Sequence, residues 1–310
     1  MIFESKKPVV FVPSDVVVVV TTRSAGRFSA LLRYTFGMFA IVALFLVAEV
    51  LYLHHAPQLV QVHGFDCADD SIRHPFVRSN LTMKDVFVLS LIPPFFMILA
   101  TEAIRLFRNN DPDLIAPCED GLSKSAKLIT RVVLFYSYLF TAITFDVLAL
   151  FFAKFSVGRL RPHFVEVCRP SVGFERCNES RWIADYTCTN TNQKQITNAR
   201  MSFFSGHSSL SATAATFLIF YLQARLQGQI KCRWFVPLAQ ALLVACTLWT
   251  GYSRVADFKH HATDVLFGFA VGILISTLVC TYGAGLSVAG SWATWRKRSL
   301  EKLPIQPAVC

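Results

Sequence analysis

The sequence predicts an all-α integral membrane protein with six transmembrane helices. Of its 310 residues, 54% are hydrophobic and only 16% are charged, which is too apolar for an ordinary soluble domain. A spanning helix needs about 20 mostly apolar residues to cross the hydrocarbon layer. Stretches of that length lie at about 34–54, 85–104, 130–152, 207–224, 234–252 and 265–287.

These spans divide the chain into one large domain with a tail at each end. Residues 1–33 form an N-terminal tail, because Pro13 and Asp15 interrupt its apolar run and leave it too short to span. Residues 34–287 form a six-span membrane domain, with a loop of about fifty residues, 153–204, between the third and fourth spans. Residues 288–310 form a basic C-terminal tail.

Basic residues near the ends of the chain predict its orientation. Lysines and arginines that flank membrane spans favour the cytoplasmic side. They gather before the first span and after the sixth, at Lys6, Lys7, Arg23, Arg27, Arg33, Arg296, Lys297, Arg298 and Lys302. Both termini are therefore expected in the cytoplasm, with the 153–204 loop outside. The net charge of +10 is scattered over several loops, so we expect no nucleic-acid partner.

The outer loops carry features of an oxidising compartment. Four cysteines are disulfide candidates, and they allow three different pairings. Two glycosylation sequons begin at Asn80 and Asn178, of which Asn178 is the better acceptor candidate because it lies farther from a span. The disulfide candidates are Cys67, Cys168, Cys177 and Cys188.

The first of three polar clusters follows the third span. Lys154, Arg159 and Arg161 lie within eight residues of one another. Three cations at a membrane boundary are suited to binding an anion. A basic patch that touches lipid headgroups is the alternative interpretation of this segment.

The second cluster directly precedes the fourth span. Ser205 and Gly206 suit the start of a helix, where free backbone N–H groups and the helix dipole favour phosphate. His207 would add a group that can donate a proton near neutral pH. The alternative is a solvated histidine with no chemical role.

The third cluster joins the fifth and sixth spans. If a helix begins near residue 258, His260 and Asp264 are four residues apart on one face. The carboxylate could then accept from Nδ1–H of His260 and leave Nε2 free as a nucleophile. Arg254 offers a fork of donors for phosphate oxygens. His261 would point about 100° away on such a helix and is expected to be a bystander; a structural His–Asp pair is the alternative.

Together the clusters supply the groups that phosphoryl transfer requires. Counting the spans places all three on the outer side of the membrane. No close pair of carboxylates with metal-ligand spacing accompanies them, and their cations would repel a divalent ion. We therefore expect catalysis with no metal ion and no cofactor.

The motifs have the order Lys-x6-Arg-Pro, Ser-Gly-His and Ser-Arg-x5-His-x3-Asp. This order resembles the phosphatidic-acid phosphatase type 2 superfamily, and the segment His63–Cys67 makes the chain similar to its animal lipid phosphate phosphatase branch. One departure is Phe204, where the superfamily often has proline. The resemblance implies that His260 attacks phosphorus, Asp264 orients it and His207 protonates the leaving alkoxide. The phosphate ligands it implies are Lys154, Arg161, Arg254, Ser205 and Gly206.

The function implied by the resemblance is a metal-independent lipid phosphate monoester phosphohydrolase with a phosphohistidine intermediate. Phosphatidate, lysophosphatidate, sphingosine 1-phosphate and ceramide 1-phosphate are the implied substrates, in phospholipid metabolism and lipid signalling. The resemblance also implies a glycoprotein of the plasma membrane, with the endoplasmic reticulum and Golgi as open alternatives. A polyprenyl-diphosphate or sugar-phosphate phosphatase and a non-catalytic membrane scaffold are the competing functions, and homo-oligomer formation is left open.

Overall fold

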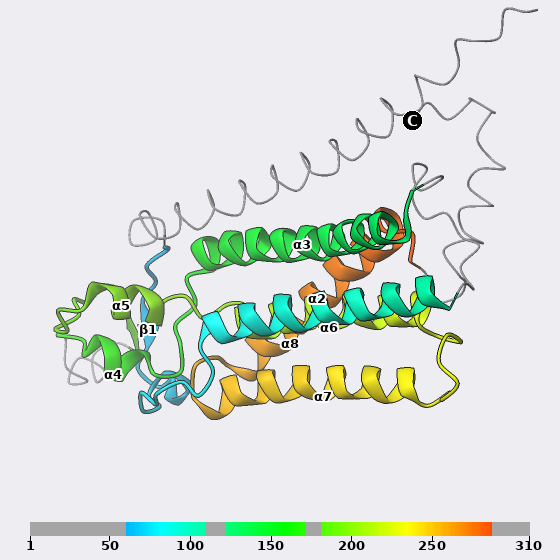
Figure 1. Ribbon diagram of the computed structural model, residues 1–310. Coiled ribbons are helices and arrows are strands. Elements are labelled where there is room, and N and C mark those ends of the chain that lie inside the picture. The colour runs from blue at the N-terminus through cyan, green and yellow to red at the C-terminus, as the bar shows by residue number, and fades with distance from the viewer. Residues whose placement is uncertain (1–59, 109–121, 172–180, 287–310) are drawn as a thin grey trace, which may run out of the picture.

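A bundle of long helices with a small lobe of short elements at one end forms the protein (Figure 1). The computed structural model describes residues 60–108, 122–171 and 181–286. The bundle contains α2 (Met83–Phe107), α3 (Lys124–Val157), α6 (Gly206–Arg225), α7 (Phe235–Ala256) and α8 (Ala262–Leu278), which continues as the π-helix η3 (Val279–Gly283). The lobe contains β1 (Phe65–Asp66), the 3-10 helix η1 (Asp70–Ile72), α4 (Phe164–Cys168), β2 (Trp182–Ile183) and α5 (Gln193–Ala199).

Five of the predicted spans coincide with these long helices, and the predicted first span, 34–54, lies outside the described residues. Within the described residues, four helices are long and apolar enough to cross a membrane: α2, α3, α7, and α8 together with η3. Helix α6 has 20 residues but is rich in serine, threonine and alanine. It packs against α2, α3, α7 and α8, so its small side chains serve contacts within the bundle.

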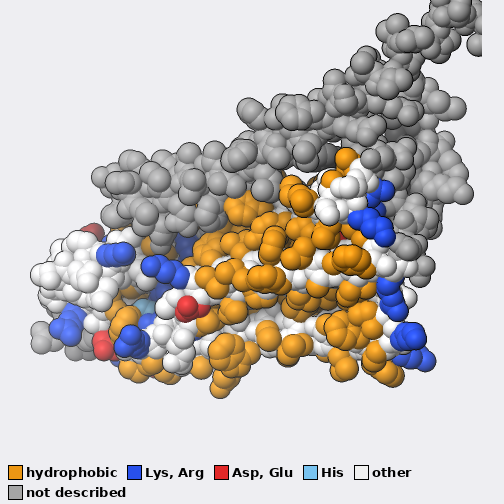
Figure 2. Space-filling view, viewed as in Figure 1, with side chains coloured by type: hydrophobic (Ala, Val, Ile, Leu, Met, Phe, Trp, Pro, Cys, Tyr) orange, Lys and Arg blue, Asp and Glu red, His pale blue; other side chains and the backbone are white. Residues whose placement is uncertain are grey.

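The side of the bundle is covered by hydrophobic side chains, whereas charged side chains gather at its two ends (Figure 2). Large apolar residues such as Phe96, Phe152 and Leu242 are exposed along the helices. A continuous apolar surface of this extent would be unfavourable in water and is favourable against lipid tails. The surface therefore agrees with the membrane character that the sequence predicts.

Two glycines of α8 allow it to approach α6 closely. A Cβ atom at Gly268 would lie 2.7 Å from Ser205 O, and one at Gly272 would collide with Ser209 O. Small residues spaced four apart let the backbones of two membrane helices come into contact. As a result the first turn of α8 lies against the first turn of α6, and the second and third polar clusters meet.

The C-terminus of α3 directs the first cluster toward the same place. The helix ends at Gly158, whose φ of 59° is left-handed and which needs no Cβ there. After this turn the chain runs beside the segment before α6: Arg161 N donates to Ala199 O at 2.8 Å, and Ser202 N donates to Arg159 O at 2.8 Å. The residues between α3 and α6 thereby cover one end of the bundle.

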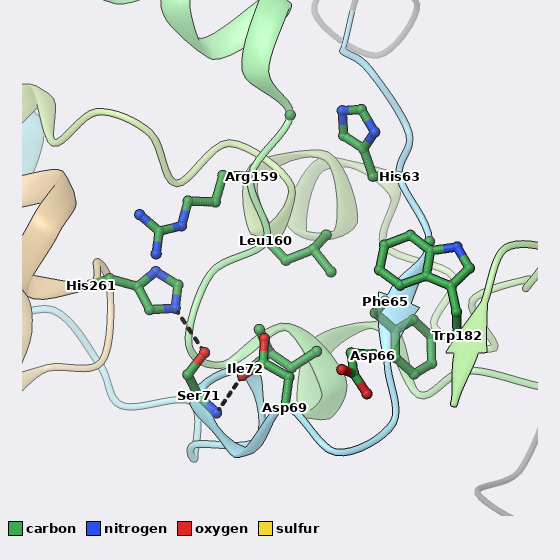
Figure 3. Close-up of a pocket in the computed structure, with 12 residues that line it drawn as sticks. His63, Phe65, Asp66, Asp69, Ser71, Ile72, Arg159, Leu160, Trp182 and His261 are labelled. Carbon is green, nitrogen blue, oxygen red and sulfur yellow. Dashed lines mark hydrogen bonds between the residues drawn. The ribbon is translucent and has the colours of Figure 1, made fainter. Parts of the chain in front are cut away.

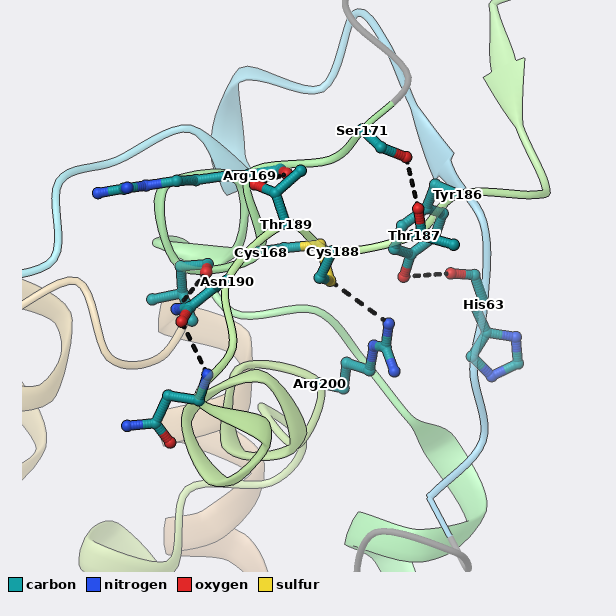
Figure 4. The surroundings of a disulfide bond; sticks show 12 residues. His63, Cys168, Arg169, Ser171, Tyr186, Thr187, Cys188, Thr189, Asn190 and Arg200 are labelled. Atoms are coloured by element: carbon teal, nitrogen blue, oxygen red, sulfur yellow. Dashed lines mark hydrogen bonds between the residues drawn. A yellow bond between two sulfur atoms is a disulfide. The ribbon is translucent and has the colours of Figure 1, made fainter.

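The lobe is small and is held together by aromatic contacts and a disulfide. Phe65 of β1 pairs with Ile183 of β2, and its ring contacts those of Phe164 and Tyr186. A disulfide joins Cys168 to Cys188 across 20 residues of sequence (Figure 4). Of the other two disulfide candidates, Cys67 is also disulfide-bonded and Cys177 lies outside the described residues.

Of the two glycosylation candidates, Asn80 is among the described residues. Asn178 lies outside the described residues. Asn80 precedes α2, and its Nδ2 donates to Asp257 Oδ1 at 3.2 Å. Glycosylation of either residue remains a prediction.

Candidate active site

The three predicted clusters meet at the lobe end of the bundle. Lys154, in the last turn of α3, donates from Nζ to Met201 O at 2.8 Å. Ser205, which caps α6, donates from its backbone N to Asp264 O in the first turn of α8 at 3.1 Å. Residues separated by more than a hundred positions in sequence therefore surround a single site.

His260 lies in the connection between α7 and α8, which corrects the predicted start of the last helix. Helix α8 begins at Ala262, not near residue 258, so His260 precedes it. Its Nδ1 is 2.7 Å from Ser202 O and 3.9 Å from Asp264 Oδ2. The predicted direct hydrogen bond from His260 to Asp264 is therefore wrong, because the carbonyl of Ser202 occupies the place of the carboxylate.

The contact with Ser202 nevertheless fixes the state of the imidazole ring. A carbonyl oxygen can only accept, so Nδ1 of His260 must carry the proton. In the neutral ring, Nε2 then has a free lone pair. The chemical state that the sequence predicted for His260 is present, but a backbone carbonyl holds it instead of a carboxylate.

Asp264 contacts His260 indirectly, through Ser202. Its Oδ2 accepts from Ser202 Oγ at 2.6 Å, and its Oδ1 accepts from Arg159 Nη1 at 2.5 Å. Arg159 is thus paired with a carboxylate and is not available for a phosphate. By bonding Ser202, the carboxylate braces the residue whose carbonyl holds His260.

His261 is part of this network and not a bystander. It is the N-cap residue of α8, and its backbone N and Nδ1 lie 3.1 Å and 3.2 Å from Asp264 Oδ2. The expectation failed because it placed His261 within a helix, where its side chain would have pointed away. As a cap, it folds back over the first turn.

His207 and Arg254 are brought together by one backbone carbonyl. Leu81 O, just before α2, is 3.2 Å from His207 Nε2 and accepts from Arg254 Nη1 at 2.9 Å. Arg254 is buried, with 1% of its surface exposed, and its Nη2 donates to Asp257 Oδ2 at 3.1 Å. The same logic as for His260 puts a proton on His207 Nε2.

The start of α6 has the predicted form of an anion-binding helix terminus. Ser205 Oγ accepts from the backbone N of Ser208 at 3.4 Å. A Cβ atom at Gly206 would meet Leu150 Cδ2 at 2.7 Å, so a larger residue would displace the packing beneath this terminus. The first turn of α6 therefore combines backbone N–H groups with the side chain of His207.

Positive charge surrounds His260. Burial and the nearby charges of Arg161 and Lys154 hold the pKa of His260 well below its ordinary value. Arg161 also donates from Nη2 to Asn198 Oδ1 at 2.8 Å. An imidazole in this environment is neutral at physiological pH, which is the form that can act as a nucleophile.

Arg159 and His261 also line a separate cavity of about 230 Å³ (Figure 3). Ser71, Trp182 and His63 are among its other lining residues. Ser71 Oγ lies 3.4 Å from His261 Nε2. The cavity borders the network that supports the site, and neither His207 nor His260 is among its lining residues.

Three parts of the site are not predicted in the sequence analysis above. The carbonyls of Ser202 and Leu81 bind side chains through the main chain, and no residue type predicts such a contact. Asp257 was more accessible to prediction, because it lies three residues after Arg254 and a charge pair at that spacing is favourable on a helix.

Cations, a helix N-terminus and two histidines at the end of an apolar helical bundle are features of a membrane-bound phosphatase. The helix terminus and the cations suit a phosphate group, and the free Nε2 of His260 suits attack on phosphorus.

Comparison with known proteins supports this class and gives the family. Residues 132–286 match the model of the PAP2 superfamily. The chain is 32% identical over 257 residues to phospholipid phosphatase 2 of Homo sapiens, covering 81% of this chain and 83% of that protein. It is 35% identical over 219 residues to phospholipid phosphatase 2 of Bos taurus, covering 71% and 72%.

Phospholipid phosphatase 1 of Rattus norvegicus is similarly related, at 33% identity over 221 residues that cover 71% of this chain and 74% of that protein. The chain therefore belongs to the PAP2 superfamily, within its phospholipid phosphatase branch, and is a phosphoric monoester hydrolase. No solved structure matches it significantly.

Proposed function

We propose that the protein hydrolyses lipid phosphate monoesters through a phosphohistidine formed on His260. The observation that carries this proposal is the hydrogen bond of 2.7 Å between His260 Nδ1 and Ser202 O. It leaves Nε2 unprotonated in a pocket surrounded by cations, and the relatives named phospholipid phosphatases support a lipid substrate.

In the proposed complex, the phosphate is bound by Lys154, Arg161 and Arg254 and by the start of α6. Arg254 provides a planar fork for two phosphate oxygens, and the backbone of Gly206 with Ser205 provides neutral donors. These groups neutralise the negative charge that develops as phosphorus becomes five-coordinate.

In the first step, Nε2 of His260 forms a bond to phosphorus while the bond from phosphorus to the lipid oxygen breaks. His207, protonated on both ring nitrogens once the phosphate dianion is bound, donates a proton to that oxygen and becomes neutral, so the lipid leaves as an alcohol. The ring of His260 gains positive charge, which the carbonyl of Ser202 and the carboxylate of Asp264 behind it stabilise.

In the second step, water attacks phosphorus and the bond to His260 breaks. His207, now without its proton, accepts one from the water. Inorganic phosphate is released and both histidines return to their starting states. All steps use side chains of this chain, so we propose that activity requires no metal ion.

The proposed membrane arrangement has six spans, with both termini in the cytoplasm and the site on the extracellular or lumenal side. The apolar bundle surface supports it, because a lipid can then keep its tails in the bilayer while its phosphate reaches the end of the bundle. Phosphatidate, lysophosphatidate, sphingosine 1-phosphate and ceramide 1-phosphate are the proposed substrates, and the plasma membrane is the proposed location.

The test is phosphate release from lysophosphatidate in mixed micelles that contain EDTA. We expect the wild-type protein to release phosphate and His260→Ala and His207→Ala to lose this activity. His63→Ala is a matched control, since this exposed histidine lies at the same end of the molecule but outside the site. Activity that survives His260→Ala would refute the nucleophile assignment, and activity that requires added Mg²⁺ would refute metal independence.

A further inference from the structure

A buried lysine of the third cluster, to which the sequence analysis assigns no role, lies next to His260. Lys259 has only 7% of its surface exposed. Its Nζ lies 3.8 Å from the centroid of the Phe76 ring, and its backbone N donates to Arg254 O at 2.9 Å. The main chain therefore fixes Lys259 between the end of α7 and a segment of the lobe.

The acidic residue closest to Lys259 in sequence is already engaged. Asp257 accepts from Arg254 Nη2 at 3.1 Å and from Asn80 Nδ2 at 3.2 Å. In the part of the chain that the structure describes, Lys259 Nζ has no hydrogen bond and no ion pair within 4 Å, and it is not sealed from solvent. Its ammonium group is thus held against an aromatic face with its donors unused.

The charges that act on Lys259 are mostly positive. Those of Arg161 and Arg254 oppose its own charge, while that of Asp257 favours it, and burial lowers the pKa of Lys259 to about 8. Both arginines are proposed phosphate ligands. Three positive charges, of Lys259, Arg161 and Arg254, thus face the single negative charge of Asp257, and such an excess in a half-dry space favours the binding of an anion.

We propose that Lys259 is a further phosphate-binding residue, located at the outer edge of the pocket that Arg161 and Arg254 form. This inference rests on the proposed function and adds a ligand to that site. Phe76 and His163, whose ring centroids lie 5.1 Å apart, belong to the outer segments that cover Lys259. Its place on the outer side means that it acts on phosphate binding more than on the reaction at His260.

The ionisation of Lys259 provides a signature that a structural role would not produce. The charged groups around it are Arg161, Arg254 and Asp257, with His163 from the start of α4 and Glu166, which accepts from Phe76 N at 2.6 Å. The ammonium form is present below a pH of about 8 and is lost above it. A phosphate monoester has its second pKa near 6, so the substrate is a dianion on both sides of this change.

The experiment compares the wild type with Lys259→Met and Lys259→Arg at pH 7 and pH 9. Lys84→Met is the matched control, because Lys84 is an exposed lysine at the same end of the bundle. The measured quantities are kcat and KM for a short-chain lysophosphatidate and the inhibition constant of inorganic phosphate. Thermal unfolding with and without inorganic phosphate is measured in parallel.

At pH 7 we expect Lys259→Met to raise KM and the phosphate inhibition constant about tenfold, with kcat changed by less than about threefold. The wild type should lose affinity between pH 7 and pH 9. Lys259→Arg should retain its affinity at pH 9, because arginine does not lose its charge in this range.

Two outcomes would overturn the inference. Unchanged KM and inhibition constant in Lys259→Met would show that Lys259 does not bind phosphate. Equal losses in the Met and Arg variants at both pH values would show a structural role. A wild type with no activity on lipid phosphates would refute the proposed function alone. In that case the thermal shift caused by inorganic phosphate still tests the inference. A shift that disappears in Lys259→Met supports it, and an unchanged shift overturns it.

Discussion

The bundle carries buried charge at both ends, but the two ends use it differently. At the end away from the lobe, the carboxylate of Glu102 accepts from Arg225 Nε at 2.9 Å and Nη2 at 2.8 Å and from Tyr221 OH at 2.9 Å, with Arg131 Nη1 at 3.6 Å. At the lobe end, Lys154 Nζ donates to the neutral carbonyl of Met201 at 2.8 Å, and Arg161 donates to Asn198 Oδ1 at 2.8 Å.

The difference shows that the partner of a buried cation matters more than its burial. A cation held by a carboxylate is already compensated, and separating the pair leaves an isolated buried charge. A cation held by a neutral carbonyl or amide can exchange that weak partner for a phosphate oxygen. The Glu102 cluster therefore has a structural role, whereas Lys154 at the lobe end can exchange its carbonyl partner for a ligand.

The largest expected effect is on stability at the Glu102 end. Glu102→Gln keeps the shape of the side chain but leaves Arg131 and Arg225 without its negative charge. We expect a loss of about 3–5 kcal/mol of unfolding free energy, measured by denaturation in detergent micelles. The Glu102→Gln protein that remains folded should have an unchanged KM. A variant as stable as the wild type would contradict the structural role of this cluster.

The corresponding change at the lobe end is Lys154→Met. It removes a charge next to the proposed phosphate site, and we expect kcat/KM to fall about 100-fold or more. Thermal stability should be nearly unchanged, because burying this charge costs free energy in the absence of phosphate. A large loss of stability, together with an unchanged kcat/KM per folded molecule, would contradict this and show that Lys154 has a structural role.

A smaller effect is expected in the pH dependence of Arg161→Met. The charge of Arg161 lowers the pKa of His260, so removing that charge raises the pKa. Protonated His260 cannot attack phosphorus, and the acidic limb of kcat/KM should therefore move upward, by about one pH unit. Arg181→Met, which removes an exposed arginine of the lobe paired with Asp66, should leave the limb in place. If the acidic limb of kcat/KM does not move in Arg161→Met, the charge of Arg161 does not control the pKa of His260.

Much of this architecture could be predicted because it depends on patterns along the sequence. The lengths of apolar segments located α2, α3, α7 and α8, and the Ser205–Gly206 pair located the start of α6. The gathering of the three clusters followed from counting membrane crossings. These inferences need no knowledge of individual contacts.

The details that failed depend on where a helix begins and on main-chain contacts. Starting α8 four residues too early gave His260 the wrong partner and excluded His261 from the network. Lys259 was passed over because the significance of a lysine there comes from Arg161 and Arg254, which fold next to it. Such contacts become visible only once the segments are placed together in space.

The central claim is a covalent phosphohistidine on His260, and this intermediate can be trapped directly. Lysophosphatidate labelled with ³²P would be mixed with the protein for milliseconds and quenched in alkali, where phosphohistidine survives, and the labelled peptide would be sequenced by mass spectrometry. We expect label on His260 in the wild type and none in His260→Ala. Label on another residue, or turnover without any label on the protein, would contradict it.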